Sequence, residues 1–341
     1  MVIDSNVYWF PELLFEDEAL MQKFLSDILN VDDTQGLVKS ENGKKQLVIE
    51  RPIGCQSLNY VQGEYELDAM LEALEEAGID KAIMKIPGCQ EWMSLEMCRL
   101  FNDGMADYQN RSDGRLIALA VVPPYGSRES LDELDRCKNE LGMHGIQLSA
   151  HYAGKYLDDE MFAALFEKIN EYGMTAYVHH TPLPVQYDSL YEFNNLRRTY
   201  GRCSDQTIAV SRELFSGMFG KYPNIKLVHS MLGGGFFTYL NMLLPPSSND
   251  TTKRFDTGNG LQREWLSENI FFETSHAQPW GKTMLECAVK ILGAEHIVYG
   301  SSYPVRKEWL TGGPDFVRAL DISDADKELI LHKNAERLYH V

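Results

Sequence analysis

The chain has 341 residues, 44% of them hydrophobic, and is therefore long enough to bury a large core. Its formal net charge of -18 and isoelectric point near 4.9 argue against a surface for nucleic acid or anionic membrane, so an anionic substrate would need local cations. The N-terminus lacks a basic segment followed by an apolar run, and no stretch of roughly 18 uninterrupted apolar residues occurs, so we expect a cytoplasmic protein that does not enter a membrane.

The N-terminal part of the chain begins with a predicted strand over 2–8, in which the alternate residues Asp4, Asn6 and Tyr8 are polar. A buried strand with one polar face indicates a barrel with a functional mouth. Residues 11–64 show no clear strand periodicity, although 13–29 could form a helix. We interpret this segment as an inserted first loop that acts as a lid or an oligomer contact.

From residue 65 onward, predicted helices and strands alternate. The predicted strands cover 81–86, 116–122, 145–149, 175–179, 225–230, 269–274 and 296–300. The predicted helices cover 65–78, 95–108, 131–141, 158–172, 207–221, 281–292 and a C-terminal segment that begins near Ser323. With the first strand, eight strands alternate with helices, which is the pattern of a single α/β domain over 1–341 with a (β/α)8 fold, the TIM barrel.

The carboxyl ends of the strands are where such barrels carry their active sites. The segment MTAYVHHTPLP at 174–184 places two adjacent histidines after an apolar strand. Because strand side chains alternate between faces, only one of His179 and His180 can share a face with Tyr177, and we place His179 inward. A single histidine in this position is often only structural, but polar residues recur at other strand ends. Those expected at the mouth include Asn6, Tyr8, Lys85, Gln147, His151, His179, His229, Glu273, His276 and Ser302.

Several longer segments of the chain are similar to one known family. They are EEAGIDKAI at 75–83, CRLFNDGMADY at 98–108, LDELDRCKNELGMHGIQL at 131–148, YLDDEMFAALFEKINEYGMTAYVHH at 156–180, LFSGMFGKYPNIKLVHSMLGGG at 214–235, IVYGSSYP at 297–304 and NAERLY at 334–339. Through them the chain resembles the amidohydrolase-related family that includes aminocarboxymuconate-semialdehyde, γ-resorcylate and 5-carboxyvanillate decarboxylases. The resemblance implies the barrel of the amidohydrolase superfamily and a homodimer, with the first loop and the loop over 245–260 as candidate contacts.

The resemblance also implies a catalytic divalent metal, commonly zinc. In the family it is bound by a His-X-His pair on the first strand, a histidine ending the fifth and an aspartate ending the eighth, and a further histidine on the sixth strand serves as acid or base. These positions fall on Asn6 and Tyr8, His179, Ser302 and Met231, so His179 alone matches. Amide, phenol and hydroxyl groups are poor zinc ligands, so we expect no metal and no cofactor. The open alternative is a relocated metal site built from His179, His229, Glu273 and His276.

We therefore predict a metal-independent lyase that decarboxylates a small aromatic or unsaturated carboxylate, with a histidine supplying the proton. The predicted ligand is a small carboxylate or phenol. Because two residues along a strand return to the same face, His229 is expected to project inward below Met231. The predicted catalytic residues are His179, His229 and Glu273. The predicted substrate-binding residues are Asn6, Tyr8, Lys85, Gln147, His276 and Ser302, with Arg51 as a second cation beside Lys85.

Two other functions remain open from the sequence. A hydrolase or hydratase would use Glu273 or a histidine as general base. A non-catalytic subunit that pairs with a catalytic relative would tolerate bulky apolar residues in its mouth, whereas an enzyme keeps a cavity lined by polar groups. Structural roles compete as well, because Lys85 could pair with Asp4 and Glu273 could belong to a buried salt bridge.

Overall fold

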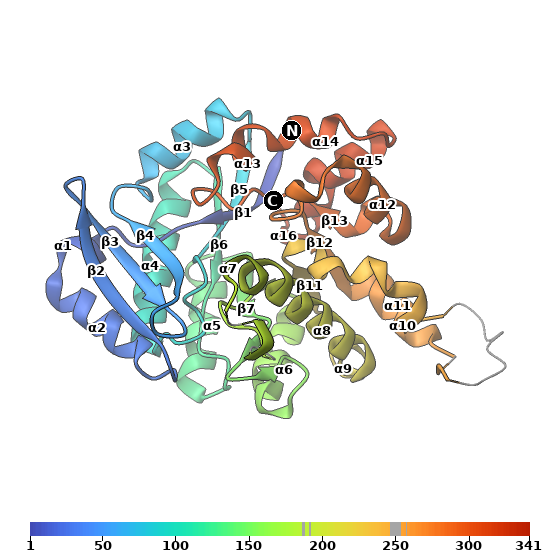
Figure 1. Ribbon diagram of the computed structural model, residues 1–341, viewed down its shortest axis with the longest axis horizontal. Coiled ribbons are helices and arrows are strands. Elements are labelled where there is room, and N and C mark those ends of the chain that lie inside the picture. Colours follow the sequence, from blue (N-terminus) through green and yellow to red (C-terminus); the bar gives the residue numbers. More distant parts are fainter. Residues whose placement is uncertain (186–187, 191, 246–253, 257) are drawn as a thin grey trace.

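The computed structural model describes residues 1–185, 188–190, 192–245, 254–256 and 258–341. Its centre is an eight-stranded parallel sheet with the order β1-β5-β6-β7-β10-β11-β12-β13 (Figure 1). The strands are β1 (Ile3–Tyr8), β5 (Lys81–Lys85), β6 (Leu116–Ala120), β7 (Gly145–Ser149), β10 (Thr175–His179), β11 (Lys226–His229), β12 (Ile270–Glu273) and β13 (Ile297–Val298). A parallel bridge from Val7 to Tyr303 brings the two edges together, so the sheet forms a nearly closed barrel. The predicted TIM barrel is confirmed.

Helices surround the barrel and alternate with its strands (Figure 1). From residue 65 onward, those of ten residues or more are α3 (Leu67–Glu76), α4 (Leu95–Arg111), α5 (Arg128–Asn139), α6 (Ala163–Tyr172), α8 (Arg202–Phe215), α11 (Gly260–Asn269) and α12 (Lys282–Leu292), and the six-residue α16 (Asn334–Tyr339) ends the chain's last helical segment. Shorter pieces are α7 (Asn194–Leu196), α9 (Met218–Lys221), α10 (Leu240–Leu243), α13 (Lys307–Thr311), α14 (Gly313–Arg318) and α15 (Asp324–Glu328). None of the helices in the described ranges is long and apolar enough to cross a membrane.

The barrel interior is filled by every second residue of the strands, as the pleat requires. One buried cluster contains Ile3, Ile83, Ile117, Leu119, Tyr177, Val228, Phe271 and Val298, closed below by residues of α16. The intervening strand residues, such as Leu227 and Phe272, belong to the larger cluster that contains the surrounding helices. This alternation fixes which strand-end side chains can reach the mouth.

The segment 11–64 is not the loop that the sequence suggested. It contains α1 (Leu13–Glu16) and α2 (Glu18–Ile28), as the helical pattern over 13–29 indicated, and then three antiparallel strands. These are β2 (Gln35–Glu41), β3 (Lys44–Glu50) and β4 (Gln56–Val61), which lie beside the barrel (Figure 1). The Phe10 ring stacks on Tyr60 of β4 with 4.4 Å between ring centroids, which anchors this insertion sheet to the barrel.

The connection after β11 is a tight left-handed turn. Met231, Leu232 and Gly233–Gly235 all have positive φ, and a Cβ on Gly234 would lie 1.7 Å from the carbonyl oxygen of Cys203. Glycine is therefore required where this turn packs on α8. The other notable connection, the loop expected over 245–260, lies largely outside the described residues.

Candidate active site

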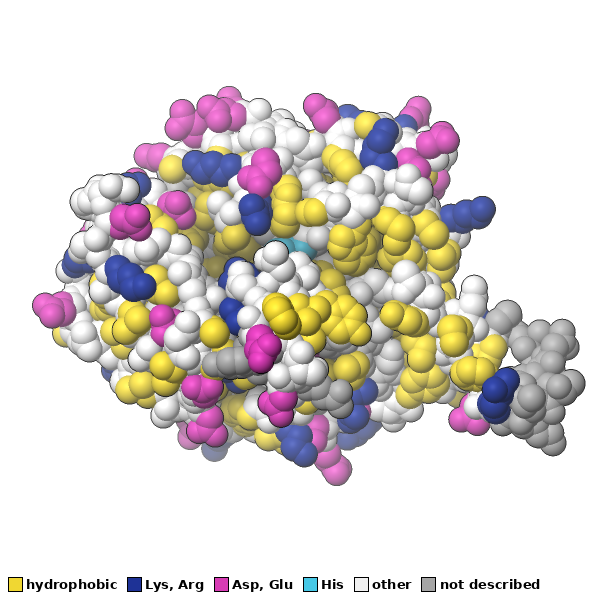
Figure 2. Space-filling model, viewed as in Figure 1, with side chains coloured by type: hydrophobic (Ala, Val, Ile, Leu, Met, Phe, Trp, Pro, Cys, Tyr) yellow, Lys and Arg dark blue, Asp and Glu magenta, His cyan; other side chains and the backbone are white. Residues whose placement is uncertain are grey.

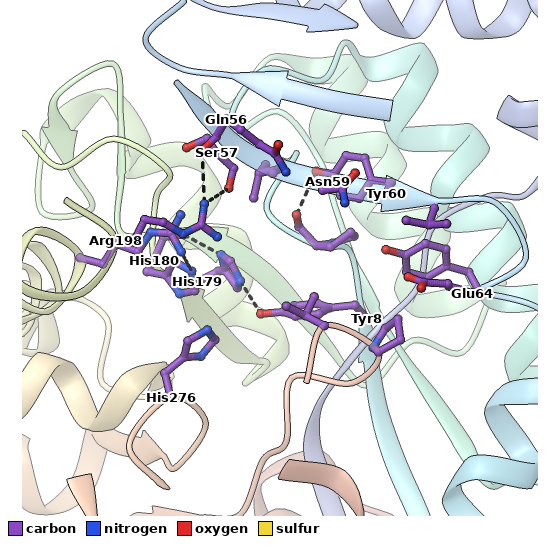
Figure 3. Close-up of a pocket in the computed structure, with 17 residues that line it drawn as sticks. Tyr8, Gln56, Ser57, Asn59, Tyr60, Glu64, His179, His180, Arg198 and His276 are labelled. Carbon is purple, nitrogen blue, oxygen red and sulfur yellow. Dashed lines mark hydrogen bonds between the residues drawn. The ribbon is translucent and has the colours of Figure 1, made fainter. Parts of the chain in front are cut away.

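A cavity of about 290 Å³ lies between the barrel mouth and the insertion sheet (Figure 3). The barrel side contributes Tyr8 of β1, His179 at the end of β10, and His276 after β12. The facing wall is the whole of β4 from the insertion. Arg198, from the π-helical turn Arg197–Gly201, and Arg202, at the start of α8, also line it. The remaining lining residues are Glu64, Tyr65, Pro87, His180, Pro304 and Val305. Three sequence-predicted residues, Tyr8, His179 and His276, therefore meet in one cavity.

Tyr8 and His179 form a hydrogen-bonded pair at the cavity wall. The Tyr8 oxygen lies 2.8 Å from His179 Nε2, and His179 Nδ1 lies 2.6 Å from the carbonyl oxygen of His180. A carbonyl oxygen only accepts, so Nδ1 carries the proton and Nε2 accepts from the Tyr8 hydroxyl. Burial, assisted by the nearby Lys85 charge, holds the pKa of His179 well below its ordinary value. The imidazole is therefore a neutral acceptor of the Tyr8 proton.

His180 also lines the cavity, although the sequence analysis allowed only one of the two histidines to do so. The reason is that β10 ends at His179, so the alternation of faces does not extend to His180. The two rings stack with 4.1 Å between centroids. Burial also lowers the pKa of His180, so a second neutral imidazole borders the cavity.

Arg202 is the main cation of the cavity and was missed by the sequence analysis. Its side chain is buried, and its Nη1 lies 3.4 Å from His180 Nε2. Its Nε and Nη2 have no hydrogen-bond partner within the described chain, and none of the described Asp or Glu side chains pairs with it. Burial lowers the pKa of Arg202 to about 9, which leaves it charged at neutral pH. A buried cation without a counter-ion favours an anion as its partner.

Arg198 adds a second positive charge at the rim. Its Nη1 donates to the carbonyl oxygens of Ser57, at 2.9 Å, and Gln56, at 3.3 Å (Figure 3). The group RRTYGRC at 197–203 was the available sequence signal, because it concentrates arginine in a chain of net charge -18. The sequence analysis required local cations for an anionic substrate but assigned them to Lys85 on a strand and Arg51 in the first loop.

His276 lines the cavity, and the predicted residues Ser302 and Asn6 lie behind its ring. Its Nδ1 is 3.3 Å from the hydroxyl of Ser302 and 3.3 Å from that of Ser275. Asn6 Nδ2 contacts both hydroxyls, at 3.1 and 2.7 Å respectively. Burial lowers the pKa of His276 to about 3, so this ring is neutral as well. Asn6 and Ser302 are therefore close to the cavity but act on His276 rather than line it.

Glu273 and Lys85 lie below the cavity, in the barrel interior. The Glu273 carboxylate accepts from Tyr177, and Lys85 Nζ lies 3.8 Å above the Tyr177 ring. Burial lowers the pKa of Lys85 to about 7 and raises that of Glu273, while the two charges oppose these effects. Asp4 is buried in the same region, and burial raises its pKa to about 7. Neither Lys85 nor Glu273 lines the cavity, so neither would contact a substrate bound there.

Two other predicted site residues point elsewhere. His229 faces outward to α8, where its Nδ1 is 2.9 Å from Gln206 Oε1 and its Nε2 is 2.7 Å from Glu213 Oε2. It faces outward because Val228, not His229, occupies the interior face of β11. Gln147 bonds both backbone groups of Ile86 at 2.9 Å and joins β7 to β5. Neither side chain lines the cavity, so this geometry gives no support to their predicted catalytic and substrate-binding roles.

The predicted cation Arg51 is also absent from the lining of this cavity. Its Nη1 lies 2.7 Å from Glu91 Oε2, and both side chains border a separate cavity of about 550 Å³. Its charge is therefore offset by a carboxylate and does not serve a substrate at Tyr8 and His179.

The residues at the barrel mouth do not fit the divalent metal that the family resemblance implies. Nowhere in the described residues do three or more His, Cys, Asp or Glu side chains gather in an arrangement that could hold a metal ion. The amide of Asn6, the phenol of Tyr8 and the hydroxyl of Ser302 are weak ligands, and both ring nitrogens of His179 are engaged. A relocated site with His229 fails because that ring faces α8.

Comparison with known proteins identifies the family to which this barrel belongs. An amidohydrolase family model matches residues 90–341. The chain belongs to the amidohydrolase family. It is 26% identical over 243 residues to 2-amino-3-carboxymuconate-6-semialdehyde decarboxylase from Dictyostelium discoideum, covering 71% of this chain and 66% of that protein. It is 24% identical over 316 residues to γ-resorcylate decarboxylase from a Rhizobium species, covering 83% of this chain and 93% of that protein.

A solved structure gives the same fold. The crystal structure of 5-carboxyvanillate decarboxylase from Sphingomonas paucimobilis matches with a TM-score of 0.75 at 20% identity, covering 100% of this chain and 99% of that chain. The named relatives are decarboxylases, and they support a carboxy-lyase activity for this chain.

Proposed function

We propose that this protein is a lyase that decarboxylates a small aromatic or unsaturated carboxylate by acid–base catalysis at His179, without a metal. The observation that carries the proposal is the buried Arg202 guanidinium, which lines the cavity beside the Tyr8–His179 pair and has no acidic partner in the described chain. It would bind the substrate carboxylate, because the three neutral imidazoles and the phenol beside it in the cavity do not compensate its charge. At about 290 Å³ the cavity lies near the small end of ligand pockets, as a single ring requires.

The reaction replaces the carbon–carbon bond to the carboxylate with a carbon–hydrogen bond. In a ring acid with a neighbouring hydroxyl, that hydroxyl passes its proton to the Tyr8 oxygen while Tyr8 passes its own to His179 Nε2. The proton then returns through Tyr8 to the ring carbon that bears the carboxylate. Carbon dioxide leaves, the bonding pair enters the ring to give a phenolate, and the phenolate takes a proton from solvent.

The properties of His179 suit this relay. Because burial lowers its pKa, the ring is free to accept the proton at neutral pH and becomes a strong acid once it holds it. The hydrogen bond from Nδ1 to the carbonyl of His180 keeps Nε2 directed at Tyr8. Before a substrate binds, the His179 ring holds this arrangement in its neutral form.

The cavity argues for an enzyme over a non-catalytic subunit. Its barrel side is lined by Tyr8, His179 and His276 rather than filled with bulky apolar side chains. Convergent polar groups in a concave site are the expected property of a catalytic relative.

The test is carbon dioxide release from a panel of hydroxybenzoates by the purified protein. The wild type is expected to turn over at least one ring acid, His179→Ala to lose this activity, and the outward-facing His229→Gln to keep it if it folds. Treatment with a chelator, with metal content followed by elemental mass spectrometry, is expected to leave the rate unchanged. Loss of activity on chelation that is restored by a divalent metal would contradict the proposal.

A homodimer is the assembly that we propose. Exposed hydrophobic side chains gather over α10 and α11 (Figure 2), and Ile208, Phe215, Tyr239 and Met242 line cavities there. An apolar face of this kind favours burial against a second copy. Light scattering is expected to give the mass of a dimer, Met242→Glu to weaken the dimer, and Leu29→Glu, at a similarly exposed position in the insertion, to leave it intact.

A further inference from the structure

Arg202 occupies a position that its own charge opposes. Its side chain is buried, and its Nε and Nη2 have no hydrogen-bond partner within the described chain. A buried charge without a partner is costly, and a long arginine side chain normally extends to place its charge in water. The residues around the first turn of α8 must therefore hold the guanidinium at the cavity.

Asp205 lies one turn further along α8, at the centre of a buried polar cluster. Its carboxylate accepts from the hydroxyl of Tyr156 at 2.6 Å and from that of Thr181 at 2.9 Å. His151 Nε2 lies 3.2 Å from the same carboxylate. These partners belong to the hairpin of β8 (His151–Tyr152) and β9 (Lys155–Tyr156) and to the segment that follows β10. Asp205 therefore joins α8 to two neighbouring connections of the barrel.

Gln206, the next residue of α8, contacts the barrel strands. Its amide nitrogen donates to the carbonyl oxygen of Val178 at 3.3 Å and to the hydroxyl of Ser230 at 3.2 Å. The Ser230 oxygen also accepts from the backbone N–H of His180 at 3.1 Å. The amide thus joins α8 to the ends of β10 and β11, beside the histidine whose ring contacts Arg202.

The backbone on both sides of Arg202 is closely packed as well. A Cβ on Gly201 would lie 2.8 Å from Pro184 Cγ, and one on Gly234 would lie 1.7 Å from the carbonyl oxygen of Cys203. Gly201 and Cys203 are the two chain neighbours of Arg202. The first turn of α8 is therefore held by packing at its backbone and by hydrogen bonds at Asp205 and Gln206.

We propose that Asp205 is a positioning residue for anion binding: its buried carboxylate holds the first turn of α8 against the β8–β9 hairpin and the segment 181–185, and so keeps the Arg202 guanidinium at the cavity. The inference rests on the proposed function for the role of that guanidinium as the carboxylate site. It also gives a role to the predicted mouth residue His151, which does not line the cavity but contacts Asp205.

Asp205 does not act as the counter-ion of Arg202. Its ion-pair partner in the described chain is His151, and hydroxyls occupy both of its carboxylate oxygens. The two roles predict opposite signs. If Asp205 merely offset the Arg202 charge, its removal would strengthen anion binding, because a negative charge near the site repels the ligand. A positioning role predicts weaker binding.

The first experiment measures binding of benzoate to the full-length protein by calorimetry. Asp205→Asn is expected to weaken binding by about tenfold, and to have no further effect in an Arg202→Met background, because it acts through that side chain. Tighter binding by Asp205→Asn, or equal weakening in both backgrounds, would overturn the positioning role. The control is Asp158→Asn, which loses the partner of Arg212 on the same helix and should keep the wild-type affinity.

The second experiment follows Arg202 itself and needs no ligand. Hydrogen exchange of its Nε–H is measured by ¹⁵N NMR, with the signal assigned by its absence from Arg202→Met. Exchange is expected to be about tenfold faster in Asp205→Asn than in the wild type, because the side chain then reaches water. Tyr156→Phe removes one hydroxyl from the carboxylate, should give a smaller increase, and replaces Asp205→Asn if that variant does not fold.

An unchanged exchange rate in the folded variants would overturn the inference, whether or not benzoate binds. A wild-type protein that does not bind benzoate would instead contradict the proposed anion site, while the exchange rates still decide whether Asp205 holds Arg202 in place.

Discussion

Replacing Arg202 with methionine should make the protein more stable and a poorer ligand-binding protein at the same time. The folded Arg202 has a pKa of about 9 against an ordinary 12.5, so it is charged at pH 7 in both the folded and the unfolded state. The difference corresponds to a cost of roughly 5 kcal/mol for holding the charge in the fold, at 1.36 kcal/mol per pKa unit. Relaxation of the structure around the charge and the loss of the Arg202–His180 contact in the variant offset part of this cost.

The free energy of unfolding of Arg202→Met is therefore expected to rise by about 1–4 kcal/mol, as for other buried charges replaced by apolar side chains of similar size. Substrate binding should weaken by roughly 10- to 150-fold, because a hydrogen bond to a charged group contributes about 1.5–3 kcal/mol. Urea unfolding of the ligand-free protein measures the change in stability. Calorimetric titration of the ligand-free protein with a ring carboxylate measures the change in binding.

The matched control lies on the same helix. Arg212 is half exposed and forms two 2.8 Å contacts with Asp158, so Arg212→Met should cost a little stability and leave ligand binding unchanged. If Arg202→Met lowers the free energy of unfolding by 1 kcal/mol or more, or binds the carboxylate as tightly as the wild type, then Arg202 is not an unpaired anion-binding cation and the reasoning fails.

Three further predictions follow from single contacts. Tyr8→Phe should lower kcat by about 10²- to 10⁴-fold with an unchanged circular dichroism spectrum, because the relay to the histidine is broken; a wild-type rate would remove Tyr8 from the mechanism. Burial lowers the pKa of His151, but the buried carboxylate 3.2 Å away outweighs this and raises it, so the stability that His151 adds over His151→Gln should be full below pH 6.5 and fall as pH rises above that. A stability difference independent of pH between 6 and 9 would contradict this. Gly300→Ala should cost about 1–3 kcal/mol in thermal unfolding because its Cβ meets Glu273, whereas Gly260→Ala, with open space around it, should be neutral; equal effects would refute the clash.

The barrel was predictable because its signal is repeated. Strands such as 145–149 and 175–179 are short apolar runs that alternate with amphipathic helices, and the structure reproduces both with the same bounds. The end of a strand is equally visible in such a pattern, which is why His179 could be placed at the mouth. Its catalytic role stays a prediction.

The direction of a side chain is harder to predict in a strand that is buried on both faces. In β11, Leu227 packs outward and Val228 inward, and both are fully buried, so the sequence offers no polar face from which to count. Counting from Met231 gave His229 the wrong face because Met231 lies beyond the strand, in a left-handed turn. Arg202 was missed for a different reason. It approaches the mouth from the start of a helix, after a long connection that no strand periodicity describes.

The insertion supplies the cavity wall that we expect to set the substrate range. β4 forms one whole wall of the cavity, and it is fixed at three points: Tyr60 stacks on Phe10, the Tyr60 hydroxyl donates to the carbonyl of Pro87 at 3.0 Å, and Arg198 binds the carbonyl of Ser57. A wall held in this way forms a cavity before any ligand arrives, so little ordering remains to oppose binding. The proposed relay at Tyr8 and the proposed anion site at Arg202 belong to the barrel and α8. Changes along β4 can therefore alter which ring fits while they leave the chemistry of proton transfer intact.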